Sequence, residues 1–137
     1  MELIECVHGN KTVRVLFDGA HNAEGTEALR QALEQGFSRR LLIFCFGMLA
    51  DKAVEQSLKI LLPLGDVFVV TCPPSVRAGN WRTIATLIKE AGYLCIEEEH
   101  ISGAVRAALD MCGEEDLLCV TGSLYMLAEA RSYVLGL

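Results

Sequence analysis

This 137-residue sequence lacks the patterns of a membrane or secreted protein. It has no run of about 18 apolar residues, which a membrane-spanning helix needs. Residues 1–5 show no signal-peptide pattern. We therefore expect a cytoplasmic protein with no membrane contact. Linkers, low-complexity stretches and internal repeats are also absent, and the length is that of one domain, so we expect a single domain over residues 1–137.

The sequence is also poor in charge. Charged residues make up 22% of the chain and hydrophobic residues 52%, and the formal net charge is −6. This composition argues against a disordered chain and against a general nucleic-acid-binding surface. We expect no nucleic-acid partner, and a small anionic ligand would need positive groups placed locally.

The sequence has no Cys-x-x-Cys pair. Its six cysteines mostly lie inside apolar runs, so buried thiols are favoured over disulfides in a chain without a secretion signal.

The sequence also has no phosphate-binding Gly-x-x-x-x-Gly-Lys-Ser/Thr loop, since residues 47–52 lack its second glycine and its hydroxyl residue. The chain alone therefore has no predicted cradle for the β- and γ-phosphates of a nucleotide.

What the sequence does contain is an alternation of apolar strands and amphipathic helices. The predicted strands are Val13–Phe17, Leu41–Phe46, Val67–Thr71, Tyr93–Ile96 and Leu117–Thr121. Each is followed by apolar residues at three- and four-residue spacing, which predicts a helix. The predicted helices are Ala23–Gln35, Lys52–Leu62, Asn80–Ala91, Gly103–Cys112 and Leu124–Val134. This pattern predicts an α/β fold with a mostly parallel sheet and helices on both faces.

One more strand is expected at the N-terminus. Residues 2–7 alternate in polarity and precede a turn at residues 8–11, so they predict an antiparallel edge strand that forms a hairpin with Val13–Phe17. The expected sheet then has about six strands in a Rossmann-like arrangement. We also expect left-handed glycines after three helices, at Gly36, Gly92 and Gly113.

Polar groups follow four of the predicted strands. These groups are Asp18–Asn22, Gly47–Lys52, Thr71–Arg77 and Thr121–Ser123. In an open parallel sheet, ligands bind outside the carboxyl ends of the strands. The N-terminus of the helix behind the first group adds N–H groups that suit phosphate or carboxylate. The four groups together form a set that can hold a nucleotide and an acidic substrate.

These residues also have structural interpretations. Asn22 and Ser123 are good helix N-caps, a role that does not exclude ligand contact. Asp18 can form a turn before the glycine that follows it. His21 can hydrogen-bond a nearby backbone carbonyl.

Similar alternatives apply to the remaining charged residues. Asp51 is a fair N-cap, which would leave Lys52 solvated, and Arg77 can pair with a surface carboxylate. The acidic runs at residues 97–99 and 114–116 are expected to be solvated loop surface. We assign no role to the two other histidines, at positions 8 and 100.

The four polar groups resemble motifs of the C-terminal domain of the Mur ligase superfamily, within it the folylpolyglutamate synthase/dihydrofolate synthase branch. Phe17–Asn22 is similar to the branch's Asp-Gly-Ala-His-Asn signature and Gly47–Lys52 to its Gly-x-x-x-Asp-Lys turn. Pro74–Ala78 is similar to its Pro-x-x-Arg-Ala segment, and Thr121–Tyr125 to its Gly-Ser-Leu/Phe-Tyr motif. Order and spacing agree over nearly the whole chain. Ala23 stands where the family usually has proline, which affects only the first helical turn.

The resemblance implies an ATP- and Mg²⁺-dependent ligase that adds L-glutamate to folate, or to a dihydropteroate precursor. In that family a carboxylate is phosphorylated to an acyl phosphate, which the amino group of glutamate then attacks. By the same resemblance, Asp18 binds the ribose of ATP, with Asn22 in the same nucleotide site. His21 lies by the phosphates and the reacting centre as the catalytic residue. Lys52 and Ser123 hold the carboxylate of the incoming glutamate.

The resemblance also implies a partner domain. Family members carry the P-loop, the Mg²⁺ ligands and most of the folate pocket on an N-terminal domain, which is absent from this sequence. The chain is therefore expected to fold alone but not to catalyse alone, and to supply no metal ligand. Arg77 is a candidate for contact with substrate or with that domain.

Other functions stay open, the second of them through the resemblance to other Mur ligases. One is a stand-alone nucleotide- or amino-acid-binding module, and another is a Mur-type ligase domain for a different acidic amino acid. A flavodoxin- or receiver-like signalling domain is disfavoured because the first parallel strand does not end in an acidic pair.

Overall fold

In the computed structural model, which describes residues 1–48, 52–75 and 79–137, six strands form one sheet and five helices flank it. The strands are β1 (Glu2–His8), β2 (Lys11–Phe17), β3 (Leu42–Phe46), β4 (Val67–Val70), β5 (Leu94–Glu97) and β6 (Leu117–Thr121). The helices are α1 (Ala23–Gly36), α2 (Lys52–Leu61), α3 (Trp81–Glu90), α4 (Ile101–Met111) and α5 (Leu124–Leu135). Every predicted element is confirmed, with ends displaced by no more than two residues.

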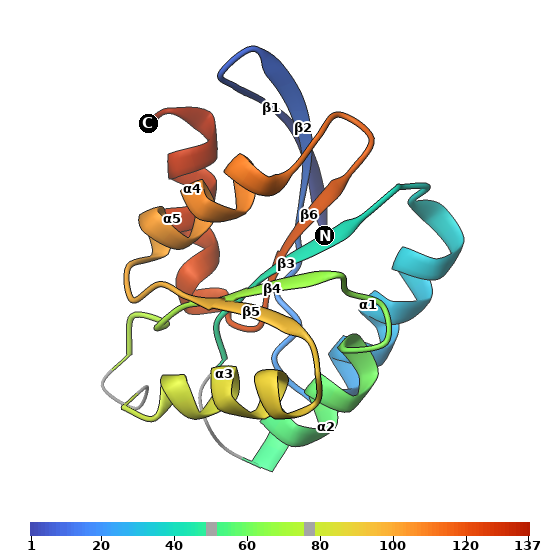
Figure 1. The fold of residues 1–137 in the computed structure, drawn as a ribbon, viewed down its shortest axis with the longest axis vertical. Helices are drawn as coiled ribbons and strands as arrows, with labels where there is room; N and C mark the ends of the chain where they lie inside the picture. The colour runs from blue at the N-terminus through green and yellow to red at the C-terminus, as the bar shows by residue number, and fades with distance from the viewer. Residues whose placement is uncertain (49–51, 76–78) are drawn as a thin grey trace.

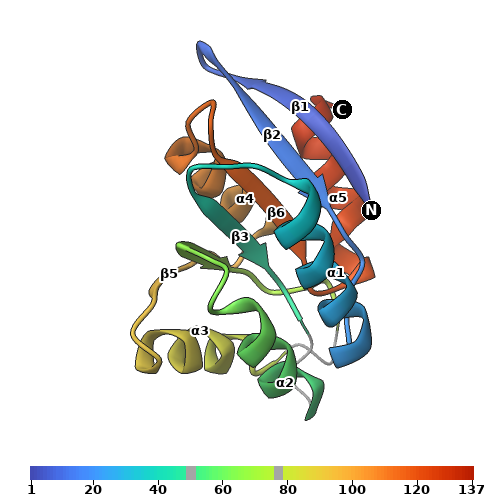
Figure 2. The same cartoon turned by 90° about the vertical axis from the view of Figure 1, so that its right-hand side faces the viewer.

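The sheet has the strand order β1-β2-β6-β3-β4-β5. Only the β1–β2 pair is antiparallel, with Cys6 opposite Val13, and every other pair is parallel. The predicted mostly parallel sheet with an antiparallel edge strand is therefore confirmed. Figure 2 shows the β1–β2 hairpin projecting beyond the helices at one end of the molecule. The last strand of the sequence, β6, lies between β2 and β3.

Two hydrophobic cores lie on the two faces of the sheet. One face packs against α1, α2 and α3 and the other against α4 and α5 (Figure 1). Phe44 and Phe46 of β3 point into the first core, and Ile43 and Cys45 into the second. Because both faces are covered, the inner strands are apolar at successive positions rather than at alternate ones.

The strand order determines where the polar motifs meet. The strands that precede them, β2, β6, β3 and β4, are consecutive neighbours in the sheet, so the carboxyl ends of these strands lie side by side at one edge. The helix after β2 packs on one face and the helix after β6 on the other. This reversal is the kind of switch point at which open α/β sheets bind ligands.

The cysteines are all unpaired. Four are buried, Cys6, Cys45, Cys112 and Cys119, and the other two are partly buried. Burial raises the pKa of Cys45 and of Cys112 to about 12, so both thiols are protonated at neutral pH. None of the helices in the described part of the chain has the length and apolar character to cross a membrane.

Candidate functional site

The turn after β2 is held against the neighbouring strand. The backbone N–H of Asp18 donates to Val120 O at 3.0 Å, and one carboxylate oxygen of Asp18 accepts from the N–H of Ala20 at 2.9 Å. Asp18 therefore forms the turn, as its structural interpretation predicted. Its other carboxylate oxygen has no hydrogen-bond donor among the described residues, so the turn also offers an acceptor to a ligand.

His21 combines a structural contact with an accessible ring. Its Nδ1 lies 3.0 Å from Gly19 O, and the side chain is exposed. A carbonyl oxygen can only accept a hydrogen bond, so Nδ1 carries the hydrogen in this contact. In the neutral imidazole, Nε2 is then the unprotonated nitrogen and can accept a proton or a hydrogen bond.

Asn22 caps α1, as predicted. Its Oδ1 accepts from the N–H of Gly25 at 2.8 Å, and its backbone oxygen accepts from the hydroxyl of Thr26 at 2.7 Å. The Thr26 hydroxyl also lies 3.1 Å from the hydroxyl of Ser57, which ties α1 to α2. The start of α1 and the preceding turn line an open depression of about 500 Å³, formed by Asp18, Gly19, Ala20, His21, Asn22, Glu24, Gly25 and Ala28.

The loop after β6 lies against the loop after β3. The N–H of Gly47 donates to Thr121 O at 3.2 Å. Gly122 has a φ of 113°, and a Cβ atom there would lie 2.8 Å from Gly47 O. Glycine is required here both by this left-handed backbone and by the close approach of the two loops.

Ser123 follows Gly122 and is buried at the start of α5. Its Oγ accepts from the N–H of Tyr125 at 3.0 Å, which confirms the predicted N-cap. This contact uses an oxygen lone pair, so the hydroxyl hydrogen is still available to donate to an anion.

Thr71, directly after β4, is held at the far side of this edge. The backbone N–H of Thr71 donates to Phe46 O, and its hydroxyl donates to Glu99 O at 3.1 Å. Arg77 and Asp51 lie outside the described residues. Lys52 is the first residue of α2, but its side chain also lies outside the description. The structure thus brings Asp18, His21 and Asn22 into one depression and Ser123 into the loop beside it.

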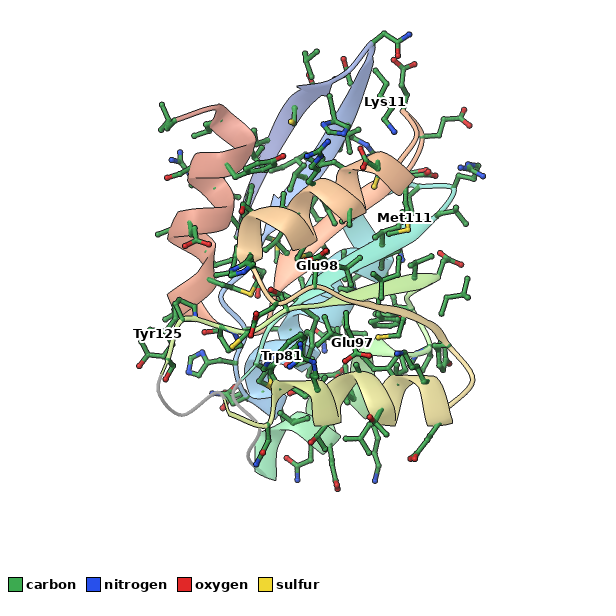
Figure 3. The ribbon with its side chains drawn as sticks, turned by 60° about the vertical axis from the view of Figure 1, so that its left-hand side comes forward. Lys11, Trp81, Glu97, Glu98, Met111 and Tyr125 are labelled. Carbon is green, nitrogen blue, oxygen red and sulfur yellow. The ribbon has the colours of Figure 1, made fainter. Side chains whose placement is uncertain are left out.

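Sequence reasoning did not single out the two residues after Ser123 as exposed. The side chains of Leu124 and Tyr125 are 62% and 61% exposed, and Figure 3 shows Tyr125 on the outer surface. Leu124 lies over the site turn, because a Cβ atom at Gly19 would come within 2.4 Å of Leu124 Cδ2.

The described side chains of the site are suited to binding and proton transfer. The described ranges contain no cluster of three or more His, Cys, Asp or Glu side chains that could hold a metal ion. The available groups are a carboxylate oxygen, an imidazole nitrogen, a serine hydroxyl and two helix N-termini. Such groups can bind ribose hydroxyls and anionic oxygens.

Comparison with known proteins gives several matches. A family model described as the Mur ligase, glutamate ligase domain matches residues 1–124. The folylpolyglutamate synthase of Lacticaseibacillus casei is 30% identical over 130 residues, which cover 91% of this chain and 28% of that protein. This chain therefore spans a little over a quarter of the length of that relative.

Solved structures agree with this match. The folylpolyglutamate synthase of Thermotoga maritima is 25% identical, with a TM-score of 0.79, and the match covers 98% of this chain and 30% of the other. The Mycobacterium tuberculosis folylpolyglutamate synthase complexed with ADP is 28% identical, with a TM-score of 0.79, over 87% of this chain and 29% of the other.

Proposed function

Since the chain belongs to the Mur ligase family through its glutamate ligase domain, we propose that it is the C-terminal domain of an ATP-dependent folate–glutamate ligase. The observation that carries the proposal is the depression at the β2 end, where the Asp18 carboxylate and His21 Nε2 are both available beside a helix N-terminus. The relatives named as folylpolyglutamate synthases, one of them complexed with ADP, support folate and ATP as substrates.

In this proposal the first site binds the nucleotide. The free carboxylate oxygen of Asp18 accepts hydrogen bonds from ribose hydroxyls. Asn22 holds the N-terminus of α1, whose partial positive charge favours the phosphates. His21 Nε2 lies beside the reacting centre, where it interacts with the group being transferred and with the attacking amine.

The second site binds L-glutamate. The Ser123 hydroxyl donates to its carboxylate, with the positive end of α5 behind it. Lys52, at the start of α2, supplies a positive charge to the same carboxylate. The incoming amine is thereby directed at the acyl phosphate that the ligase forms on folate or dihydropteroate.

The remaining machinery belongs to an N-terminal domain. The chain has no P-loop, and its described residues include no metal-binding cluster. We therefore assign the β- and γ-phosphates and Mg²⁺ to that domain, with Arg77 a candidate contact to it or to substrate. Catalysis then requires closure of the two domains around the substrates. The six unpaired cysteines support a reducing compartment, the cytoplasm.

The first experiment measures the length of the native protein, by immunoblot of source cells with an antibody against residues 1–137. We expect a band roughly three to four times the 15.0 kDa of this chain, given its 28% coverage of the Lacticaseibacillus casei relative. That native protein is then assayed for ATP-dependent incorporation of labelled L-glutamate into tetrahydrofolate. A native 15 kDa species without ligase activity would overturn the proposal in favour of a stand-alone binding module.

The same assay tests the role of His21. His21→Ala is expected to lower kcat by about 100-fold or more, because positioned acid–base groups contribute on that order. His8→Ala is the matched control, since His8 lies in the β1–β2 hairpin and pairs with Asp110. Its turnover should equal that of wild type. Near-normal turnover of His21→Ala would remove His21 from the catalytic role.

A further inference from the structure

Thr121 ends the central strand β6 with an unsatisfied hydroxyl. Its side chain is 1% exposed, and in the described part of the chain its Oγ1 is the only buried side-chain polar atom without a hydrogen-bond partner. Burying a hydroxyl without a partner carries a free-energy cost, and native proteins rarely accept it without a reason. The position of Thr121 at the ligand-binding edge of the sheet suggests such a reason.

The direction of the Thr121 side chain follows from strand alternation. Leu117 and Cys119 of β6 contribute to the core under α1, α2 and α3, whereas Leu118 and Val120 contribute to the opposite core. Successive side chains along a strand point to opposite faces. Thr121 therefore lies on the face of Cys119, on the side from which α1 covers the sheet.

The Asp18 carboxylate lies on the same face. Phe17 is paired with Val120, and the N–H of Asp18 donates to Val120 O, so Asp18 is the neighbour of Thr121 on the adjacent strand path. Burial and the nearby charge of Asp18 together raise the pKa of the Cys119 thiol, which agrees with a carboxylate on this face. Neighbouring strands are about 4.8 Å apart, a separation that a hydroxyl and a carboxylate can bridge by side-chain rotation.

We propose that Thr121 is a positioning residue whose hydroxyl donates to the free carboxylate oxygen of Asp18 when a nucleotide occupies the depression. The inference rests on the proposed function, because it places a ribose at Asp18. The N–H of Ala20 already holds one carboxylate oxygen. A second donor on the other oxygen fixes the plane of the carboxylate and aims its remaining lone pairs at the ribose hydroxyls. Binding of the nucleotide and formation of the hydrogen bond from the Thr121 hydroxyl to Asp18 then favour each other.

If the Thr121 hydroxyl only stabilised the fold, its removal would lower the stability of the protein. The positioning role predicts a different result. Thr121→Val keeps the shape of the side chain and removes only the hydroxyl. Because that hydroxyl has no partner in this structure, its loss should leave the stability of the fold unchanged or raise it. Thr26→Val is the matched control, since it removes an equally buried hydroxyl that bonds Asn22 O and Ser57. Thr26→Val should lower the urea midpoint.

The experiment uses the ¹⁵N-labelled 137-residue chain, which contains both of its hydrophobic cores. ADP is titrated to millimolar concentration while the amide resonances of residues 18–28 are followed by NMR. Thr121→Val should weaken ADP binding by about tenfold, the equivalent of one hydrogen bond to a charged group. Thr121→Ser, which keeps the hydroxyl, should bind within about twofold of wild type. Urea unfolding of the same variants provides the stability readout.

The outcomes separate the inference from the function on which it rests. If Thr121→Val binds ADP as wild type does, the positioning role is wrong and the nucleotide site stands. If Thr121→Val lowers the urea midpoint as Thr26→Val does, the hydroxyl has a structural role and the inference is also wrong. If ADP shifts no resonance of residues 18–28 in wild type, the titration is repeated on the full-length native protein, and if ADP shifts none of them there either, the nucleotide assignment fails and the inference fails with it.

Discussion

The buried polar groups at the two ends of β6 differ in whether they have hydrogen-bond partners. Before its amino end, the carboxylate of Asp116 is fully buried and accepts hydrogen bonds from Arg40, from the N–H of Leu41 and from the N–H of Gly113, at 2.8 to 3.1 Å. At its carboxyl end, the Thr121 hydroxyl has no hydrogen-bond partner, and the nearby Asp18 carboxylate has one oxygen that accepts no hydrogen bond from a described residue.

This difference separates a structural polar group from groups available for binding. Asp116 joins the α4–β6 loop to the start of β3, and its satisfied carboxylate can do nothing else. The carboxyl end keeps unpaired donors and acceptors, which reduces stability there but leaves them free for a ligand. Stability and ligand binding are thus assigned to opposite ends of the same strand.

The largest expected effect comes from breaking the amino end. Asp116→Ala should lower the free energy of unfolding by about 2–4 kcal/mol, because it removes three hydrogen bonds to a buried carboxylate and leaves the partly buried N–H groups of Leu41 and Gly113 unpaired. Urea denaturation measures the change. The neighbouring exposed residue gives the control, and Glu115→Ala should stay within about 0.5 kcal/mol of wild type. A loss below about 1 kcal/mol for Asp116→Ala would mean that the two ends do not differ as described.

A backbone change at the carboxyl end should have the next largest effect. Gly122→Ala should cost about 1–3 kcal/mol, since alanine is strained at a φ of 113° and its Cβ would collide with Gly47 O. Gly36→Ala is the control, because a Cβ there meets no atom within 4 Å and no left-handed φ is involved. Equal urea midpoints for the two variants would contradict the close contact between the loops.

Loss of the cap on α5 should have a smaller effect. Ser123→Ala should lower the free energy of unfolding by about 1 kcal/mol, the usual contribution of an N-cap. Ser123→Asn retains a capping side chain and should be close to wild type in thermal unfolding. If both variants lose equal stability, the packing of Ser123 matters more than its hydrogen bond to the N–H of Tyr125.

The smallest effect concerns an exposed pair at the hairpin end of the molecule. The His8 side chain, 2.6 Å from Asp110, holds the pKa of that carboxyl below its usual value near 3.8. The lowered pKa means that Asp110 stabilises the fold above about pH 3.8 and that this contribution is lost as the pH falls through the lower native pKa. A ¹³C NMR titration should find the Asp110 pKa raised in His8→Ala and unchanged in His100→Ala. An unchanged pKa in His8→Ala would contradict the contact.

Much of the fold could be predicted because its signals are local. Continuous apolar runs identified the strands, three- and four-residue spacing identified the helices, and the identities of Asn22 and Ser123 identified two caps. The insertion of β6 between β2 and β3 has no local signal, since it depends on which strand edges pair across most of the chain.

Two predictions from the sequence were wrong. Asp116 was predicted to be solvated because two glutamates precede it, but its donors include Arg40 and Leu41, which are distant in sequence. Of the three glycines expected to be left-handed, only Gly92 has a positive φ. In the candidate site, the side-chain hydrogen-bond partners of Asp18 and Asn22 are local and were predictable. The unpaired hydroxyl of Thr121 is visible only once its neighbours are placed.

The central position of β6 also has a consequence for folding during synthesis. Residues 117–121 leave the ribosome after the other strands of this sheet, so the edges of β2 and β3 that face β6 lack this partner until then. Both edges belong to apolar strands, and unpaired apolar edges in an incomplete sheet are prone to aggregation. Because the sheet becomes continuous only when β6 inserts, the nascent domain is most exposed to aggregation in the interval before residues 117–121 have emerged.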